Sequence, residues 1–262
     1  MGTSSIYKGP KDRDPLLPEG FEEEYDKEEE KTQEDIEIIA PWKAAKTAMS
    51  QYIKESHSNR GRVFRSYTRA LGGSKNAAST ARSGIKSAVN LGRLLSTISS
   101  EGFETTFQRL SIDFRGKGVE ELFSTLVNVL VPESNTKEDI IARKASVEAL
   151  SQLYEFVVQH DMDIKILDSL DESLFNKVMS TFISSFIFER LLNDLESRFE
   201  IYASNVELAI SKELEVKEYV HQNTEVRLRE VNFKGFNYRQ VSIENVIQNI
   251  YKECYEVLEG YV

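Results

Sequence analysis

Apolar residues recur at three- and four-residue intervals along most of the chain beyond residue 41, which is the spacing of amphipathic helices. Between residues 119 and 131, for example, Leu122, Leu126 and Leu130 fall on one face. A sustained apolar stripe of about thirty residues follows Asp171. The pattern predicts helices over residues 42–56, 63–71, 74–99, 119–131, 137–159, 172–201 and 205–231, and a last one from 243 to the C-terminus.

Residues that favour helix ends lie at several of these boundaries. Pro41 suits the first position of a helix, and Gly72-Gly73 suits a C-terminal cap. Ser and Thr hydroxyls and Asp carboxylates accept hydrogen bonds from the first backbone amides of a helix. Helix N-caps are therefore expected at Ser74, Thr136, Asp171 and Ser242. Residues 103–118 predict a loop with room for a short strand, anchored by Phe103, Phe107, Leu110, Ile112 and Phe114.

Small residues crowd the predicted helix over 74–99, and Gly84 and Gly92 lie within it. Each glycine lowers helix stability by about 1 kcal/mol relative to alanine, so this helix requires tertiary support. We expect its small-residue face to allow another helix to approach closely. No fixed-period repeat is present, and these patterns together predict an all-α fold of stacked long antiparallel helices.

The first forty residues differ from this pattern. Pro10, Pro15 and Pro18 remove backbone donors, and residues 19–37 are dominated by Glu and Asp, which repel one another. We therefore expect an extended, largely disordered N-terminal tail over 1–40. A basic, Ala/Gly/Ser-rich helical region follows over 41–100, and a long-helix domain over 101–262 completes the predicted organisation.

The net charge of −10 is unevenly distributed. Residues 1–42 carry −8, residues 43–93 carry +10, and residues 94–262 carry −12, an asymmetry that favours a specific charged contact. Cys254 is the only cysteine, which indicates a reducing compartment, and we expect it to be buried and inert. Because no apolar run is long enough to span a bilayer, we expect a cytoplasmic protein without membrane contact.

No catalytic or metal-binding constellation is visible. His57, His160 and His221 are far apart and lack ligand spacing, so surface or helix-end positions are the simpler interpretation. The run Gly72-Gly73-Ser74-Lys75 lacks the full phosphate-loop pattern, and we interpret it as a helix stop and restart. We therefore expect no cofactor, no metal and no enzymatic activity of the chain itself.

The basic zone at 43–93 is a candidate contact surface for phosphates or for an acidic partner protein. At helical spacing Arg62, Arg65 and Arg69 share a face. The alternative is intramolecular pairing with the acidic tail. The candidate contact residues are Arg60, Arg62, Arg65, Arg69, Arg82 and Lys86.

Two N-terminal blocks resemble one known family. The first comprises Met-Gly-Thr-Ser at the start, Tyr7, Gly9-Pro10 and Pro15-Leu16-Leu17-Pro18. The second comprises Trp42-Lys43-Ala44-Ala45-Lys46, Gly61, Arg65, Tyr67 and residues 70–73. These blocks are similar to the start of the QatB family, a component of the bacterial Qat anti-phage defence systems. The remaining helical part matches that family only in character.

The resemblance implies a set of partners. QatB proteins occur with a predicted ATPase, a TatD-like nuclease and an enzyme resembling the deazaguanine synthases of queuosine biosynthesis (QatC-like). Such an enzyme activates a carboxylate with ATP and can form an amide with an amine. The resemblance therefore implies that Gly2, exposed after removal of Met1, is the acceptor amine. The tail residues expected to contact that enzyme are Thr3, Ser4, Ser5, Tyr7, Leu16 and Leu17.

Two functional hypotheses follow. The leading one is a non-catalytic partner or substrate of the deazaguanine-synthase-like enzyme, acting through the N-terminal tail. The second is a nucleic-acid-binding adaptor that uses residues 43–93 to recruit the nuclease or the ATPase. A third, an independent enzyme, has the least support because no nucleophile–base pair is visible.

Overall fold

The computed structural model describes residues 33–54, 59–131, 136–202 and 206–260, and every regular element in these ranges is a helix. The all-α prediction is therefore confirmed. Most of the predicted tail, residues 1–32, lies outside the described residues. The described helices share one continuous hydrophobic core, which includes residues from Ala45 to Leu258.

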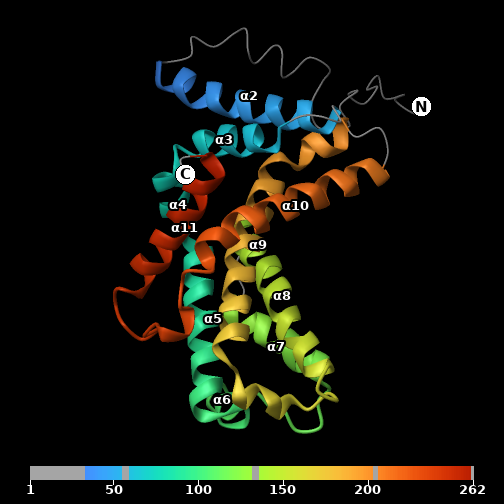
Figure 1. Cartoon of the computed structure of the whole chain (residues 1–262), viewed down its shortest axis with the longest axis vertical. Coiled ribbons are helices and arrows are strands. Elements are labelled where there is room, and N and C mark those ends of the chain that lie inside the picture. The colour runs from blue at the N-terminus through green and yellow to red at the C-terminus, as the bar shows by residue number, and fades with distance from the viewer. Residues whose placement is uncertain (1–32, 55–58, 132–135, 203–205, 261–262) are drawn as a thin grey trace, which may run out of the picture.

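The first helices lie together at one end of the molecule (Figure 1). Helix α2 (Gln33–Lys54) begins earlier than predicted, and Pro41 lies inside it rather than at its first position. Helix α3 (Arg60–Ala70) begins after Asn59, whose side chain accepts a hydrogen bond from the Gly61 amide at 2.9 Å. Gly72 and Gly73 both have φ near +86°, so they stop α3 and allow the chain to restart, as predicted.

The single helix predicted over 74–99 is wrong, because the chain breaks at Thr80–Ala81 into α4 (Ser74–Ser79) and α5 (Arg82–Glu101). The buried Arg190 guanidinium explains the break. It donates to Ala77 O at 2.8 Å and to Thr80 Oγ1 at 2.9 Å, and so satisfies groups at the end of α4. Ser74 is not the N-cap either: Gly73 holds that position, without a side-chain hydrogen bond.

Two glycines of α5, Gly84 and Gly92, leave room for aromatic rings to pack against the helix. A Cβ atom at Gly84 would lie 2.7 Å from the ring of Phe186, and one at Gly92 would overlap the ring of Tyr238. Phe186 belongs to a neighbouring helix, so close helix approach is confirmed at Gly84, whereas Tyr238 comes from a connecting segment.

The loop predicted over 103–118 is partly wrong, because its first half forms α6 (Phe103–Arg109). A tertiary contact supports this short helix: the Phe103 amide donates to Asp168 Oδ1 at 2.6 Å. Phe103 and Phe107 are buried as expected, whereas Leu110 is exposed.

The remaining helices follow the predictions closely. These are α7 (Val119–Leu130), α8 (Lys137–Val158), α9 (Glu172–Tyr202), α10 (Val206–Leu228) and α11 (Ile243–Glu259), with short 3-10 turns η1 (Ile164–Ser169) and η2 (Phe233–Gly235). The expected caps at Thr136 and Asp171 are confirmed, since Thr136 accepts from the Asp139 amide and Asp171 from the Leu174 amide. Ser242 precedes α11 but makes no side-chain cap hydrogen bond.

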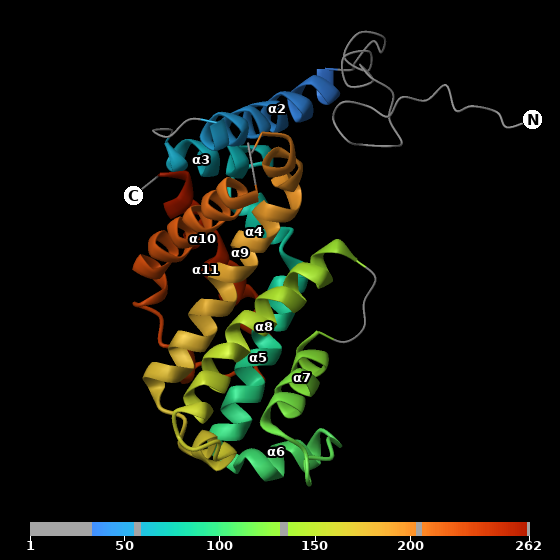
Figure 2. The ribbon, with the colours of Figure 1, turned by 90° about the vertical axis from the view of Figure 1, so that its right-hand side faces the viewer.

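Helices α5, α7, α8 and α9 run along the long axis, with α2 and α3 at one end and α6 at the other (Figures 1 and 2). Helix α9 contacts α8 on one side and α10 on the other, and α11 packs against α3, α4, α5 and α10. Cys254 on α11 is fully buried, as expected, and burial raises the pKa of its thiol well above the usual range.

Two polar contacts tie the first helices to the bundle. Tyr67 of α3 donates to Asp194 of α9 at 2.7 Å, and Tyr52 of α2 donates to Glu215 of α10 at 2.6 Å. Lys212 Nζ lies 4.7 Å from the centre of the Tyr52 ring and 3.2 Å from Glu215 Oε2. These contacts orient α2 and α3 across the ends of α9 and α10.

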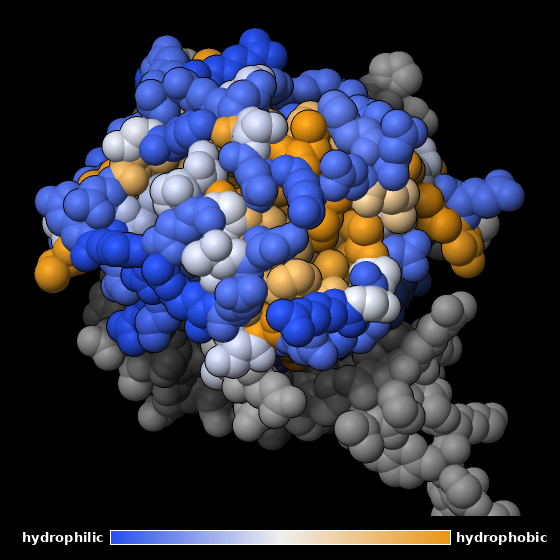
Figure 3. All heavy atoms as spheres, turned by 90° about the horizontal axis from the view of Figure 1, so that it is seen from below, coloured by the Kyte–Doolittle hydropathy of each residue, from blue (hydrophilic) through white to orange (hydrophobic). Residues whose placement is uncertain are grey.

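The end of the bundle that carries α6 exposes apolar side chains among polar ones (Figure 3). Leu110 and Met162 are exposed, and Ile112, Phe114 and Ile164 are half-buried against the core. Within the described residues, none of the helices is both long enough and apolar enough to cross a membrane.

Candidate functional site

The predicted tail contacts fall outside the described residues. This applies to the proposed acceptor Gly2 and to the proposed contact residues Thr3, Ser4, Ser5, Tyr7, Leu16 and Leu17. Their roles stay predictions.

Four of the predicted basic contacts lie exposed on α3. Arg65 Nε donates to the backbone oxygen of Glu259 at 3.1 Å, and Arg69 Nε lies 3.9 Å from the carboxylate of the same residue. Arg60 lies over the ring of Tyr219, 5.8 Å from its centroid. Cations at the end of α11 complement the partial negative charge of its last carbonyls, so Arg65 and Arg69 have a structural role.

The other two predicted basic contacts, Arg82 and Lys86, are exposed on the first turns of α5. Ser83 between them donates to Asp139 of α8 at 2.7 Å. Burial opposes ionisation of Asp139, but hydrogen bonds from Ser83 and Thr136, with the charge of Lys86, lower its pKa. Of the predicted basic residues, Arg65 and Arg69 thus contact α11, Arg60 contacts α10, and Lys86 lies near Asp139 of α8.

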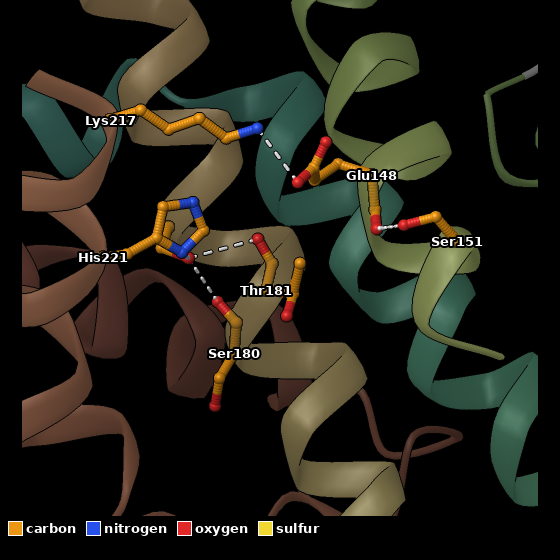
Figure 4. A network of polar contacts seen from close by, with 7 residues as sticks. Glu148, Ser151, Ser180, Thr181, Lys217 and His221 are labelled. Atoms are coloured by element: carbon orange, nitrogen blue, oxygen red, sulfur yellow. Dashed lines mark hydrogen bonds and ion pairs between the residues drawn. The ribbon is translucent and has the colours of Figure 1, made fainter. Parts of the chain in front are cut away.

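The described structure also contains an open surface cavity, lined in part by charged side chains, that the sequence analysis missed. Its volume is about 430 Å³, and it lies along α9 between α8 and α10. Lys217 reaches across from α10 and donates to Glu148 Oε1 on α8 at 2.9 Å (Figure 4). The lining residues are Glu148, Gln152, Thr181, Leu214, Lys217, Glu218 and His221.

His221 is the central polar group of this cavity. Its Nδ1 lies 2.8 Å from Ser184 Oγ, and that hydroxyl donates to Ser180 O at 2.8 Å. The single hydroxyl proton of Ser184 is used in the bond to Ser180 O, so Ser184 can only accept a hydrogen bond from His221. We therefore assign the imidazole proton to Nδ1. The Nε2 atom is enclosed and accepts no hydrogen bond from the described residues. His221 was expected at a surface or helix end, and it instead lies half-buried in the middle of α10.

The accessible groups of the cavity are the carboxylates of Glu148 and Glu218 and the ammonium of Lys217, whereas both ring nitrogens of His221 are enclosed. Burial, with the nearby positive charge of Lys217, lowers the pKa of His221, so the ring is neutral at pH 7. Ser184 is buried and engaged with its own helix, which makes it a poor nucleophile. The arrangement suits recognition of a hydrogen-bond donor or a cation better than covalent chemistry.

One sequence signal could have located part of this cavity. Lys217 and His221 are four residues apart, which places them on one face of a helix. Their partner Glu148 lies on another helix, and helical spacing alone does not identify it. Among the described residues, no cluster of three or more His, Cys, Asp or Glu side chains is placed to hold a metal ion.

Comparison with known proteins identifies the family. A family model described as Qat anti-phage system associated protein QatB matches residues 72–258, more than half of the chain. Neither a curated protein nor a solved structure matches the chain. The match covers every residue that lines the cavity, whereas the two blocks that suggested the resemblance lie almost entirely before it. The chain therefore belongs to the QatB family and is a component of the Qat anti-phage defence system.

Proposed function

We propose that the chain is a non-catalytic component of the Qat system and the partner and substrate of its deazaguanine-synthase-like enzyme. The family match over residues 72–258 supports membership of the Qat system, and the role of the tail rests on the resemblance of residues 1–18 to the start of that family. In it, the helical body docks the enzyme while the N-terminal tail enters its active site. Thr3, Ser4, Ser5 and Tyr7 supply contacts there, and Leu16-Leu17 supplies an apolar anchor.

The proposed chemistry is amide formation at the amine of Gly2. The partner enzyme joins its carboxylate substrate to AMP, with release of pyrophosphate from ATP. The Gly2 nitrogen then attacks the activated carbonyl carbon, AMP leaves, and the nitrogen loses a proton. A glycine amine has no side chain to obstruct this attack, which makes it a sterically suitable acceptor.

The geometry of the described residues supports a non-catalytic role for the chain itself. His221 contacts a serine that is buried and bonded to Ser180 O, so the pair is not presented to a substrate. Productive general-base catalysis requires an accessible nucleophile within hydrogen-bond reach.

The mass of the N-terminal tryptic peptide tests the proposal. The full chain is expressed alone and with its co-encoded proteins, and trypsin is expected to release residues 2–8. We expect a mass gain on Gly2 only when the neighbours are present. Gly2→Pro or a blocking N-terminal tag should abolish both modification and phage defence, and a C-terminal tag is the control. An unmodified peptide in both preparations, or full defence with a blocked N-terminus, would reject the proposal.

A second candidate function is nucleic-acid binding through α3 and the start of α5. The observation in its favour is the exposure of Arg62, Arg65 and Arg69 on α3. Phosphate contacts would make binding steeply dependent on salt. Arg62→Ala should weaken retention on DNA or RNA without disturbing α11, because the contacts with Glu259 come from Arg65 and Arg69. Failure of the unmodified protein to bind either polymer at low salt would exclude this function.

A further inference from the structure

Helix α10 carries two rows of apolar residues, and only one of them packs against the core. Its inner face buries Val216, Val220 and Leu228 almost completely. Its outer face carries an apolar stripe at four-residue spacing, in which Val206, Ile210 and Leu214 are 73%, 53% and 59% exposed. A contiguous row of exposed apolar side chains marks an interaction surface, so the outer face of α10 has the character of an interface.

The apolar stripe of α10 leads directly into the surface cavity. Leu214 belongs to both, and Val147 on α8, next to Glu148, is 55% exposed. Helix α9 lies between α8 and α10, so the two exposed apolar positions belong to the helices that flank it (Figure 2). The surface thus combines an exposed apolar row with an open cavity of about 430 Å³.

Carboxylates dominate the charge around this surface. Glu196, Glu207 and Glu218 are exposed on α9 and α10. Burial first, and then the charges of Glu189 and Glu196, raise the pKa of Glu213, although the charges of Lys144 and Lys217 oppose this.

The neighbouring lysines each offset one other carboxylate, so within the described residues Glu196, Glu207 and Glu218 remain without an ion pair. Lys144 lies 3.1 Å from Glu189, Lys217 donates to Glu148, and Lys212 is turned inward to Tyr52 and Glu215. A second copy of the same face would bring like charges together, which costs several kcal/mol at an interface. The charge therefore favours a basic occupant.

We propose that the outer face of α10 and the adjoining cavity bind a basic amphipathic helix of a partner protein. The apolar side of that helix covers Val206, Ile210 and Leu214. Its Lys or Arg residues meet the surrounding glutamates, and one of them enters the cavity to reach Glu218. This docking site is separate from the tail, so its failure would leave the proposal for Gly2 untouched.

Two designed peptides of about 18 residues, or five helical turns, test whether this surface prefers a basic amphipathic helix. One has a leucine face with lysines elsewhere, and the other replaces every lysine with glutamate. Binding to the full chain is measured by fluorescence anisotropy. We expect the lysine peptide to bind and the glutamate peptide not to bind. Equal binding of both, or of neither, would overturn the proposal.

Matched variants locate the binding surface. Ile210→Lys and Leu214→Lys should each weaken the lysine peptide by at least about tenfold, since each removes a buried apolar contact and adds a like charge. Val241→Lys adds the same charge at a fully exposed position before α11 and should leave binding unchanged. Equal effects of all three variants would place the peptide elsewhere. All three positions are exposed, so circular dichroism should report an unchanged fold.

Light scattering of the free chain tests whether a second copy of the chain covers this face instead. We expect a monomer mass for the wild-type protein and for Ile210→Lys. A wild-type dimer that Ile210→Lys converts to a monomer would show that a second copy covers this face and would overturn the proposal of a basic partner.

Discussion

The contact between Gly92 of α5 and the ring of Tyr238 provides a quantitative test of the packing. A Cβ atom at residue 92 would overlap the Tyr238 ring. That ring is 2% exposed, and its hydroxyl donates to Phe233 O at 3.0 Å. Because the ring is enclosed on its other sides, it cannot move aside without loss of packing in the segment that joins α10 to α11.

The expected effect of Gly92→Ala combines two opposing terms. Alanine gains about 1 kcal/mol of helix propensity over glycine. Overpacking costs about 1–3 kcal/mol, and displacement of a buried aromatic ring costs up to about 3–5 kcal/mol. We expect a net loss of about 2–3 kcal/mol in the free energy of unfolding. For a chain of this size the midpoint of thermal unfolding should fall by roughly 5–10 °C.

Urea denaturation followed by circular dichroism measures this loss, and a double-mutant cycle tests its cause. In a Tyr238→Ala background the clash is gone, so Gly92→Ala should change sign and stabilise by up to about 1 kcal/mol. Gly118→Ala, where no atom lies near the added Cβ, should cost less than about 1 kcal/mol. If Gly92→Ala destabilised both backgrounds equally, the steric reasoning would be refuted.

Three further substitutions test other contacts. Tyr67→Phe should cost about 1–2 kcal/mol by urea denaturation, because Asp194 loses its donor, and an unchanged midpoint would contradict that. Thr136→Ala should cost about 1 kcal/mol through loss of the α8 N-cap, whereas Thr136→Ser should restore it. The lowered pKa of His221 means that the unfolded state binds its proton more readily. The free energy of unfolding should therefore fall as pH drops below about 6.5. In urea titrations from about pH 5 to 7.5, His221→Gln should remove part of this pH dependence. Parallel wild-type and variant profiles would show that His221 is not its cause.

Local signals in the sequence predicted much of the fold. The caps at Thr136 and Asp171 depend only on a side chain and an amide three residues later, so their residue types are sufficient to predict them. The apolar stripes likewise predicted α7, α8 and α9 with boundaries close to those observed.

Contacts between distant residues account for the incorrect predictions. Asp168 supports the start of α6, and Arg190 ends α4 from more than a hundred residues away, and neither contact has a local signature. The cavity around His221 was missed for the same reason, because Glu148 and Lys217 meet only after α8 and α10 pack on α9. The tail residues that suggested the family lie outside both the described structure and the family match.

The buried thiol of Cys254 can be used to measure how often α11 separates from the rest of the bundle. Because it is the only cysteine and its thiol is enclosed beneath α11, a thiol reagent can react only when that helix transiently separates from the bundle. The ratio of its reaction rate in the unfolded chain to that in the native chain gives the free energy of this separation, about 1.4 kcal/mol for each factor of ten. Partner binding that holds α11 in place would slow the reaction, so the chain can report its own assembly without an added label.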